Sequence, residues 1–239
     1  GTPVDNIEQS VYEVRNFYTK VNLLIHLLQD KEEYQKVLVF VSGKRNADRI
    51  FEKLDEHFNG ELGVIHSNKT QNFRIKAIQK YESGDTRILI ATDVMARGLD
   101  LDQISHVINF NTPAFPENYM HRIGRTGRAE HKGKSILLFK EIEREYKEAI
   151  EELMDMKIPV VEFPEEVEIS DQKTPDERPD NYIFKRDDRN TKKDSEAGAS
   201  FHEKKLKNQK TNQGGKYKRE IKKKYKKPKT RSGKKGSKK

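Results

Sequence analysis

Short apolar runs alternate with longer amphipathic stretches over the first two thirds of the chain. The runs are rich in β-branched residues, and breaks such as Ser42-Gly43 and Ser83-Gly84-Asp85 separate the units. This alternation is typical of an α/β fold in which helices flank a parallel sheet. We therefore expect strands at 10–14, 37–41, 62–65, 87–91, 106–110 and 135–139, and helices at 20–29, 45–58, 71–81, 116–123 and 141–154.

Polar or small residues follow four of the expected strands directly. They are Gly43, His66, Thr92 and Asn111. In open α/β sheets, ligands bind at the carboxyl ends of the strands, where these turns meet. We therefore expect the functional residues of this chain to lie along that edge of the sheet.

Charge divides the chain into two parts. Residues 185–239, here called the basic tail, hold 23 Lys or Arg against 6 Asp or Glu, whereas residues 1–184 carry a net charge of −8. So basic a segment with few apolar residues cannot bury enough surface to fold alone, and we expect disorder from roughly Ser170 onward. The resulting prediction is a folded domain at 1–164, an acidic proline-containing linker at 165–184 and the basic tail.

Other features of the composition mainly exclude classes of protein. The chain has no cysteine, so it holds no disulfide and no thiolate metal site. No apolar run approaches the roughly 18 residues of a membrane-spanning helix, and we expect a cytoplasmic protein. The seven histidines form no helical pair at ligand spacing, so we expect no metal site and expect each histidine at the surface or in a turn. The chain begins with Gly1 rather than methionine, which suggests a piece of a longer protein.

The most informative motif is His-Arg-Ile-Gly-Arg-Thr-Gly-Arg at 121–128, here called the arginine motif. Arginine keeps its charge at any working pH and presents a rigid fork of donors that matches phosphate oxygens. The glycines allow the backbone to approach a ligand closely. A solvated basic turn is the alternative for such a motif alone. The segment Ala-Thr-Asp-Val-Met-Ala-Arg-Gly-Leu-Asp at 91–100 makes that alternative much weaker.

Together with the strand at 37–41, these two motifs resemble the C-terminal RecA-like lobe of a DEAD-box ATP-dependent RNA helicase. The resemblance runs from about Ile7 to about Pro164. Related helicases typically have glutamine at the first position of the arginine motif, so His121 favours the DEAD-box group over a DNA-directed helicase, which remains a weaker alternative. The resemblance implies a RecA-like fold, ATP and Mg²⁺ as cofactors, and RNA and an N-terminal RecA-like lobe as partners.

The resemblance also implies roles on the nucleotide side. Arg125 and Arg128 are expected to be arginine fingers at the γ-phosphate, and His121 to join the network beside it. Arg122 is expected to brace its loop through a salt bridge to the lobe's own acids. Asp100 is expected to accept a hydrogen bond from the ribose, with Gly98 beside it, although an aspartate after Gly-Leu is by itself usually a turn residue or a cap.

A second set of residues is expected, by the same resemblance, to contact the RNA backbone without reading bases. The set comprises Thr92, Arg97, Gly43, Lys44, Ser67, Asn68, Gln71 and Arg74. Two positions depart from the family pattern: Ser67-Asn68 stands where Gly-Asp is common, and Gly43 where Thr is common. For these residues a plain turn remains an equal alternative.

The chain lacks a Gly-x-x-x-x-Gly-Lys-Ser/Thr loop and an Asp-Glu-Ala-Asp segment. The phosphate cradle and the magnesium ligands are therefore expected on the N-terminal lobe, and this chain alone is not expected to hydrolyse ATP.

The basic tail interleaves tyrosines with lysines, as at 216–219 and 222–227, which is typical of sequence-independent single-strand binders. We expect it to tether RNA, although a merely solubilising lysine run is the plainer interpretation. The leading hypothesis is the second lobe of an RNA helicase. The alternative is an RNA-binding or RNA-annealing module that acts mainly through the tail.

Overall fold

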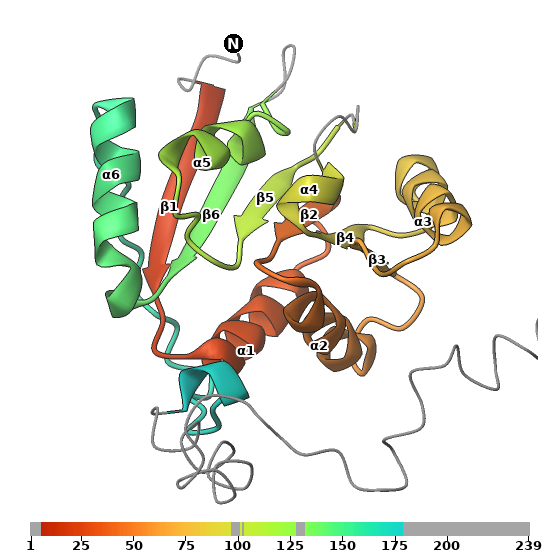
Figure 1. Ribbon diagram of the computed structural model, residues 1–239, viewed down its shortest axis with the longest axis horizontal. Helices are drawn as coiled ribbons and strands as arrows, with labels where there is room; N and C mark the ends of the chain where they lie inside the picture. The colour runs from red at the N-terminus through yellow and green to blue at the C-terminus, as the bar shows by residue number, and fades with distance from the viewer. Residues whose placement is uncertain (1–5, 97–100, 102, 128–131, 179–239) are drawn as a thin grey trace, which may run out of the picture. The chain divides into compact units, whose positions relative to one another are not determined.

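The computed structural model describes residues 6–96, 101, 103–127 and 132–178 of the 239-residue chain, and the basic tail lies outside them. Six parallel strands form one sheet in the order β1-β6-β5-β2-β4-β3 (Figure 1). Their bounds are Ile7–Glu13 (β1), Val37–Phe40 (β2), Leu62–Ile65 (β3), Ile88–Ala91 (β4), His106–Asn109 (β5) and Gly133–Phe139 (β6). The central strands are buried on both faces, which explains why their sequences are continuous apolar runs.

Helices cover both faces of the sheet. One face packs against α1 (Phe17–Leu28) and α2 (Lys44–Asp55), which contribute Leu24, Ile50 and Leu54 to the largest core cluster. On the other face lie α3 (Gln71–Ser83), the short α4 (Asp93–Ala96), α5 (Pro116–Ile123) and α6 (Arg144–Met154). This is the predicted α/β architecture, and its parallel sheet flanked by helices is RecA-like.

The element bounds differ from the predicted ones mainly where side chains cap helices. Helix α1 begins at Phe17 rather than 20, because the Asn16 side chain accepts a hydrogen bond from the Thr19 amide. A 3₁₀ turn at Glu141–Glu143 precedes α6, where one longer helix was expected. Helix α4 was not predicted, because four residues are too few to show a helical period.

Strand β1 is an edge strand, as expected, but its outer side is partly covered by the chain itself. The amide of Val11 donates to Pro159 O at 2.9 Å, and the amide of Val161 donates to Val11 O at 2.8 Å. Residues 159–161 therefore extend the sheet in parallel beyond β1. This pairing satisfies backbone groups that an exposed edge would offer to other chains.

Lys20 is almost fully buried where β5 and β6 end. Its Nζ donates to Phe110 O at 2.8 Å and to Leu138 O at 2.5 Å, and it lies 3.3 Å from Glu143 Oε2. Burial lowers the pKa of Lys20 to about 8, and the nearby Glu143 carboxylate opposes this shift. The lysine thus links α1 to two strand ends and to the 3₁₀ turn before α6.

The structure corrects the predicted boundary at residue 164. Residues 165–178 pack back against α1 instead of forming an open linker, and Val167 lies in the core. Asn22 Nδ2 donates to Glu168 O at 2.9 Å, and Asn16 Nδ2 donates to Ser170 O. Local composition indicated a linker, but contacts with α1, some 150 residues earlier, decide the packing. The compact unit therefore extends at least to Arg178, and 170–178 are not the start of a disordered region.

Glu177 completes this returning segment at the start of α1. Its carboxylate accepts hydrogen bonds from the Phe17 amide at 2.9 Å and from Lys140 Nζ at 3.1 Å. Burial by itself raises the pKa of Glu177, but the bonds from Thr174, Lys140 and Phe17 outweigh burial and hold the pKa below its ordinary value. The carboxylate also suits its place near the positive end of the α1 dipole.

Replacing Glu177 by glutamine tests whether residues 165–178 stabilise the lobe. The variant loses the ion pair with Lys140, so we expect the free energy of unfolding at pH 7 to fall by about 1.5 kcal/mol. Because folding lowers the pKa, this contribution is present above the ordinary value of 4.5 and is lost as the pH falls through the folded value.

Urea unfolding at pH 7 and at pH 3 measures both effects. Asp176→Asn, at the exposed neighbouring position, is the control and should leave stability unchanged. Equal stability of Glu177→Gln and the native chain at pH 7 would contradict a stabilising role.

Candidate functional site

The turns after four neighbouring strands meet at one edge of the sheet, as the sequence predicts. The Ser42 amide donates to Asn111 Oδ1 at 2.9 Å, which joins the turns after β2 and β5. The Thr92 amide donates to Ile65 O at 3.3 Å, which joins the start of the turn after β4 to the end of β3. This carboxyl edge therefore brings together segments that lie up to 70 residues apart.

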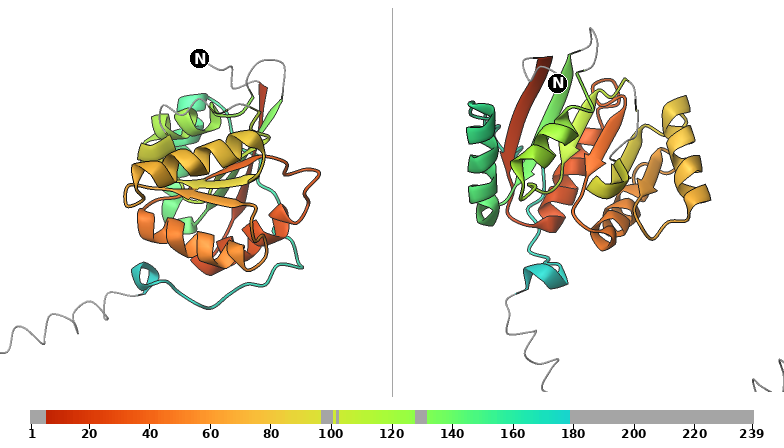
Figure 2. Two further views of the ribbon diagram at one scale, coloured as in Figure 1. Left: turned by 90° about the vertical axis from the view of Figure 1, so that its right-hand side faces the viewer. Right: turned by 45° about the horizontal axis from the view of Figure 1, so that its top comes forward.

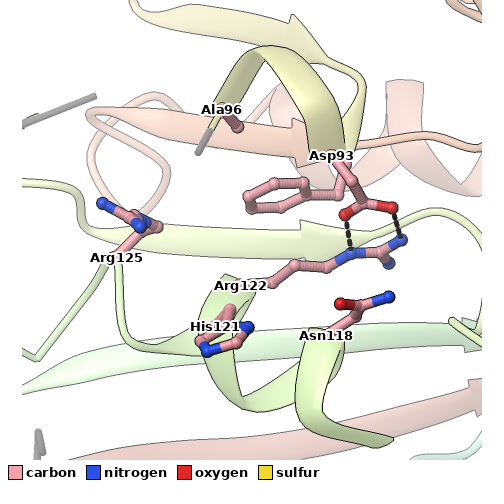
Figure 3. Close-up of a pocket in the computed structure, with 7 residues that line it drawn as sticks. Asp93, Ala96, Asn118, His121, Arg122 and Arg125 are labelled. Atoms are coloured by element: carbon pink, nitrogen blue, oxygen red, sulfur yellow. Dashed lines mark hydrogen bonds and ion pairs between the residues drawn. The ribbon is translucent and has the colours of Figure 1, made fainter. Parts of the chain in front are cut away.

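Arg122 is the most constrained residue of this edge. Its Nε and Nη2 donate to the two oxygens of Asp93 at 2.6 and 2.8 Å (Figure 3), and Nη1 donates to Asn109 Oδ1 at 3.2 Å and Asn111 O at 2.9 Å. Its guanidinium also lies 5.2 Å from the centre of the Phe40 ring. The side chain is only 2% exposed. Arg122 is thus the structural brace that was expected, because all of its charge is used inside the lobe.

Sequence reasoning expected an acid beside Arg122 but did not identify it. Asp93 is that acid, and Asn109 is the second side chain that satisfies the guanidinium. The available signal was the position of Asp93 directly after Thr92 at the end of a strand. Neither residue could be paired with Arg122 without the strand order, since β4 and β5 contact each other only through β2.

His121 and Arg125 flank Arg122 and line a small cavity with it. The cavity has a volume of about 10 Å³, and Asp93, Asn118 and Ala96 also line it. Figure 3 shows the side chains of His121 and Arg125 on the side away from the guanidinium that Asp93 binds. His121 is exposed and Arg125 is half-buried, whereas Arg122 between them in sequence is buried. A phosphate group could meet this pair only at the mouth, because the cavity holds no more than a water molecule.

The turn that carries Arg125 is held at both ends. The Arg125 amide donates to Arg122 O at 3.1 Å, and the Thr126 amide donates to Ile123 O at 3.0 Å. Thr126 Oγ1 also donates to Ile104 O at 2.5 Å, just before β5. The predicted residues Arg97, Gly98, Asp100 and Arg128 lie outside the described residues.

Lys44 and Asn68 of the predicted RNA set lie in contact. Lys44 Nζ donates to Asn68 Oδ1 at 2.8 Å, which links the first residue of α2 to the turn before α3. Gly43 caps α2 with φ of 84° and makes no side-chain bond to the helix, so the first amides of α2 are open to an anion. At this φ a threonine would be strained, so this chain's turn depends on glycine. Ser67 is exposed beside Asn68.

Gln71 and Arg74 also interact, in the first turn of α3. Arg74 Nη2 donates to Gln71 Oε1, and Arg74 Nη1 donates to Met95 Sδ at 2.7 Å. Met95 lies in α4, three residues after Thr92, so Arg74 connects the two halves of the predicted RNA set. Arg74 Nε is buried with no hydrogen-bond partner among the described residues.

His66 lies in the turn after β3, as expected, but its side chain is buried beneath this surface. Its Nε2 lies 2.9 Å from Asp48 Oδ1, and its Nδ1 accepts from the Asn68 amide at 3.3 Å. Burial raises the pKa of Asp48, but hydrogen bonds from His66 and Lys69 outweigh it and hold that pKa below its ordinary value. The network fixes the turn that carries Ser67 and Asn68. His106, on β5, is a second buried histidine.

Two further observations concern the described residues as a whole. No group of three His, Cys, Asp or Glu side chains is gathered there that could hold a metal ion. None of the helices described is both long enough and apolar enough to cross a membrane.

Arg122→Ala should destabilise the lobe by about 3 kcal/mol, because it leaves Asp93 and Asn109 without their shared partner. Arg122→Lys should recover only part of this loss, since an ammonium group cannot bind both oxygens of Asp93 in the same fork. Urea unfolding monitored by circular dichroism measures the effect. Arg45→Ala, at an exposed position of α2, is the control. A loss for Arg122→Ala no larger than that of the control would contradict the bracing role.

Comparison with known proteins connects this edge to a family. The model of the helicase conserved C-terminal domain matches residues 19–130. The ATP-dependent RNA helicase RhlB of Pseudomonas syringae pv. tomato is 40% identical over 154 residues, which cover 64% of this chain and 38% of RhlB. The E. coli DEAD-box protein SrmB aligns with a TM-score of 0.61 at 30% identity, covering 70% of this chain and 97% of the SrmB chain. Domain 2 of the DEAD-box helicase Mss116p, solved bound to an RNA duplex, aligns with a TM-score of 0.59 at 26% identity, covering 66% of each chain.

The chain therefore spans about two fifths of the length of RhlB, and it spans 26% of the helicase DeaD of Buchnera aphidicola. The family match includes the whole of α5, which carries Arg122, and extends through the arginine motif. Because the same fold covers nearly all of the matched SrmB chain, this chain belongs to the DEAD-box RNA helicase family, as its C-terminal RecA-like lobe.

Proposed function

We propose that the chain acts as the second lobe of an ATP-dependent RNA helicase that locally unwinds RNA duplexes. The observation that carries this proposal is that the residues of the arginine motif differ in their contacts. Arg122 forms an ion pair with Asp93 and holds the motif in place, while His121 and Arg125 line the mouth of the cavity beside it. A rigid frame with Arg125 at the mouth of the cavity suits a site that is completed by a second lobe.

In this proposal Arg125 and Arg128 contact the γ-phosphate of ATP held by the N-terminal lobe. The hydrogen bonds of the turn after α5 fix the backbone of Arg125, so the place from which its side chain reaches a phosphate is set before ATP arrives. His121, exposed beside it, is placed to bond a phosphate oxygen or the water that attacks it. Asp100 and Gly98 are assigned to the ribose by family resemblance alone.

The residues of this lobe fit ATP and Mg²⁺ only if both are held mainly by the N-terminal lobe. The described residues offer cations to a polyphosphate at a cavity of about 10 Å³, which cannot enclose a nucleotide. Bound Mg²⁺ would supply positive charge that stabilises the negative charge developing on the transferred phosphate. The residues of this chain would orient the phosphate and stabilise its charge from the opposite side.

The RNA surface is proposed to run across the starts of α2 and α3. The open amides after Gly43 and the cations Lys44 and Arg74 can bind phosphate oxygens without reading bases. Thr92 precedes by three residues Met95, which Arg74 contacts. Mss116p domain 2, which shares this fold, was solved with an RNA duplex.

The second candidate is an RNA-binding or RNA-annealing module that acts mainly through the basic tail. The tail holds 23 basic and only 6 acidic residues, and this positive charge favours the RNA-binding module. In the helicase the same tail would tether RNA and raise its local concentration at the lobe.

Arg125→Ala and Arg128→Ala test the finger assignment in a chain that joins this lobe to a DEAD-box N-terminal lobe. RNA-stimulated ATP hydrolysis should fall by about 10³-fold or more, because charge on the transferred phosphoryl group is no longer stabilised. Steady-state ATPase assays measure this, and Arg15→Ala, at an exposed arginine outside both proposed surfaces, is the matched control. ATPase that survives both substitutions would rule out the assignment.

Deleting residues 185–239 separates the two candidates. We expect the lobe to bind single-stranded RNA more weakly without the tail and to lose most of the salt dependence, since fewer counterions are released. Fluorescence anisotropy at several salt concentrations measures both quantities. In the two-lobe chain, RNA-stimulated ATPase should persist after the deletion. Loss of that ATPase together with RNA binding would favour the tail-centred module.

A further inference from the structure

We propose that the outer edge of β3, in the groove between α2 and α3, binds an extended apolar segment of another protein that carries acidic residues, as an added strand. Strand β3 is last in the sheet order, and among the described residues it pairs only with β4. Figure 2 (left) shows this edge facing the viewer between α3 and α2. This surface is separate from the turns that are proposed to bind RNA.

The backbone of β3 has groups free to pair at this edge. Glu61 O accepts from the Ile88 amide at 3.1 Å, and Ile65 O accepts from the Thr92 amide at 3.3 Å, so odd-numbered residues direct their polar groups toward β4. Because these directions alternate along a strand, the N–H and C=O groups of Leu62 and Val64 point away from the sheet. An incoming strand could bond to both residues.

The groove beside this edge is apolar and has a volume of about 220 Å³. Phe51 of α2 and Phe73 and Ala77 of α3 form its walls, and Phe73 is 45% exposed. Thr86 also lines the groove, and its hydroxyl is buried with no hydrogen-bond partner. A buried polar atom without a partner is costly, and a peptide group in the groove would satisfy it.

The positive charge of the groove favours a partner segment with negatively charged side chains. Lys76 and Lys80 line it and make no ion pair with any residue that the structure describes, and no carboxylate lines it. With Phe73 and Ala77 they follow the i, i+3, i+4, i+7 spacing of one face of α3, whereas Arg74 is turned toward Met95. Acidic side chains next to the apolar ones would pair with these lysines.

The opposite edge of the same sheet shows what kind of segment fits. There the chain covers β1 with its own residues 159–161, which belong to the sequence Pro-Val-Val-Glu-Phe. A short extended segment that is apolar where it pairs, and that is followed directly by Glu162, therefore already pairs in parallel with one edge of this sheet. At β3 none of the described strands pairs with the outer edge, and the groove beside it holds two lysines that make no ion pair within the described part of the chain.

The test uses an acetylated, amidated peptide Glu-Val-Val-Glu-Phe-Glu, with the full chain. We expect binding by fluorescence anisotropy, shifts of the Leu62 and Val64 amides in ¹⁵N spectra, and slower hydrogen exchange at both. A peptide with lysine in place of glutamate, and one N-methylated at alternate amides, should fail to bind.

Two variants test the groove directly. Lys80→Glu and Phe73→Ala should each weaken peptide binding about tenfold, which corresponds to 1.4 kcal/mol. Both side chains are exposed, so the fold should survive. Lys173→Glu and Ile142→Ala, exposed positions elsewhere, are the matched controls and should bind the peptide as the native chain does.

Several outcomes would overturn the proposal. Shifts confined to Val11 and its neighbours would mean that the peptide displaces residues 159–161 at β1 instead. Equal binding by Lys80→Glu, Phe73→Ala and the native chain would remove the groove from the site. Shifts of the Leu62 and Val64 amides produced by an RNA oligonucleotide, and not by the peptide, would make this a nucleic-acid surface. Self-association through β3 without peptide binding would make it a contact between copies.

Discussion

The bidentate pair between Arg122 and Asp93 is the interaction on which the candidate site depends. It joins α5 to the end of β4, and the bonds to Asn109 and Asn111 extend the connection to the end of β5. A buried guanidinium is stable only if its donors are satisfied, and here four acceptors and the face of Phe40 surround it. Because the bonds of Arg122 lie inside the lobe, this residue holds the arginine motif in place, and Arg125 of the same motif lines the cavity beside it.

Similar internal contacts support the rest of the carboxyl edge. Lys20 satisfies carbonyls where β5 and β6 end, and His66 with Asp48 holds the turn after β3. In each case one buried polar side chain fixes a turn that connects a strand to a helix. Surface groups such as Lys44 and Asn68 are thereby positioned at low entropic cost, which is what a sequence-independent phosphate surface requires.

The two edges of the sheet differ in how they are completed. At β1 the chain adds its own residues 159–161, and the segment that follows continues across α1 to Glu177. At β3 the described residues add nothing, and Lys76 and Lys80 stand beside the open backbone. Lysines beside an edge strand disfavour non-specific pairing with the strands of other chains. They also favour a specific partner that carries acidic side chains.

The sequence by itself determined the class of fold, most element positions and the family, because strand and helix periods and the arginine motif are local patterns. It also indicated that Arg122 differs in role from Arg125. Only the tertiary structure decided that Asp93 and Asn109 are the partners of Arg122, that His66 is buried and that residues 165–178 pack on α1. Each of these contacts joins segments distant in the chain, so it depends on the order of strands in the sheet, which local periodicity does not encode. Composition correctly marked residues 165–178 as acidic and polar, with a proline at 175, but burial of Val167 and the bonds of Glu177 outweigh that local preference.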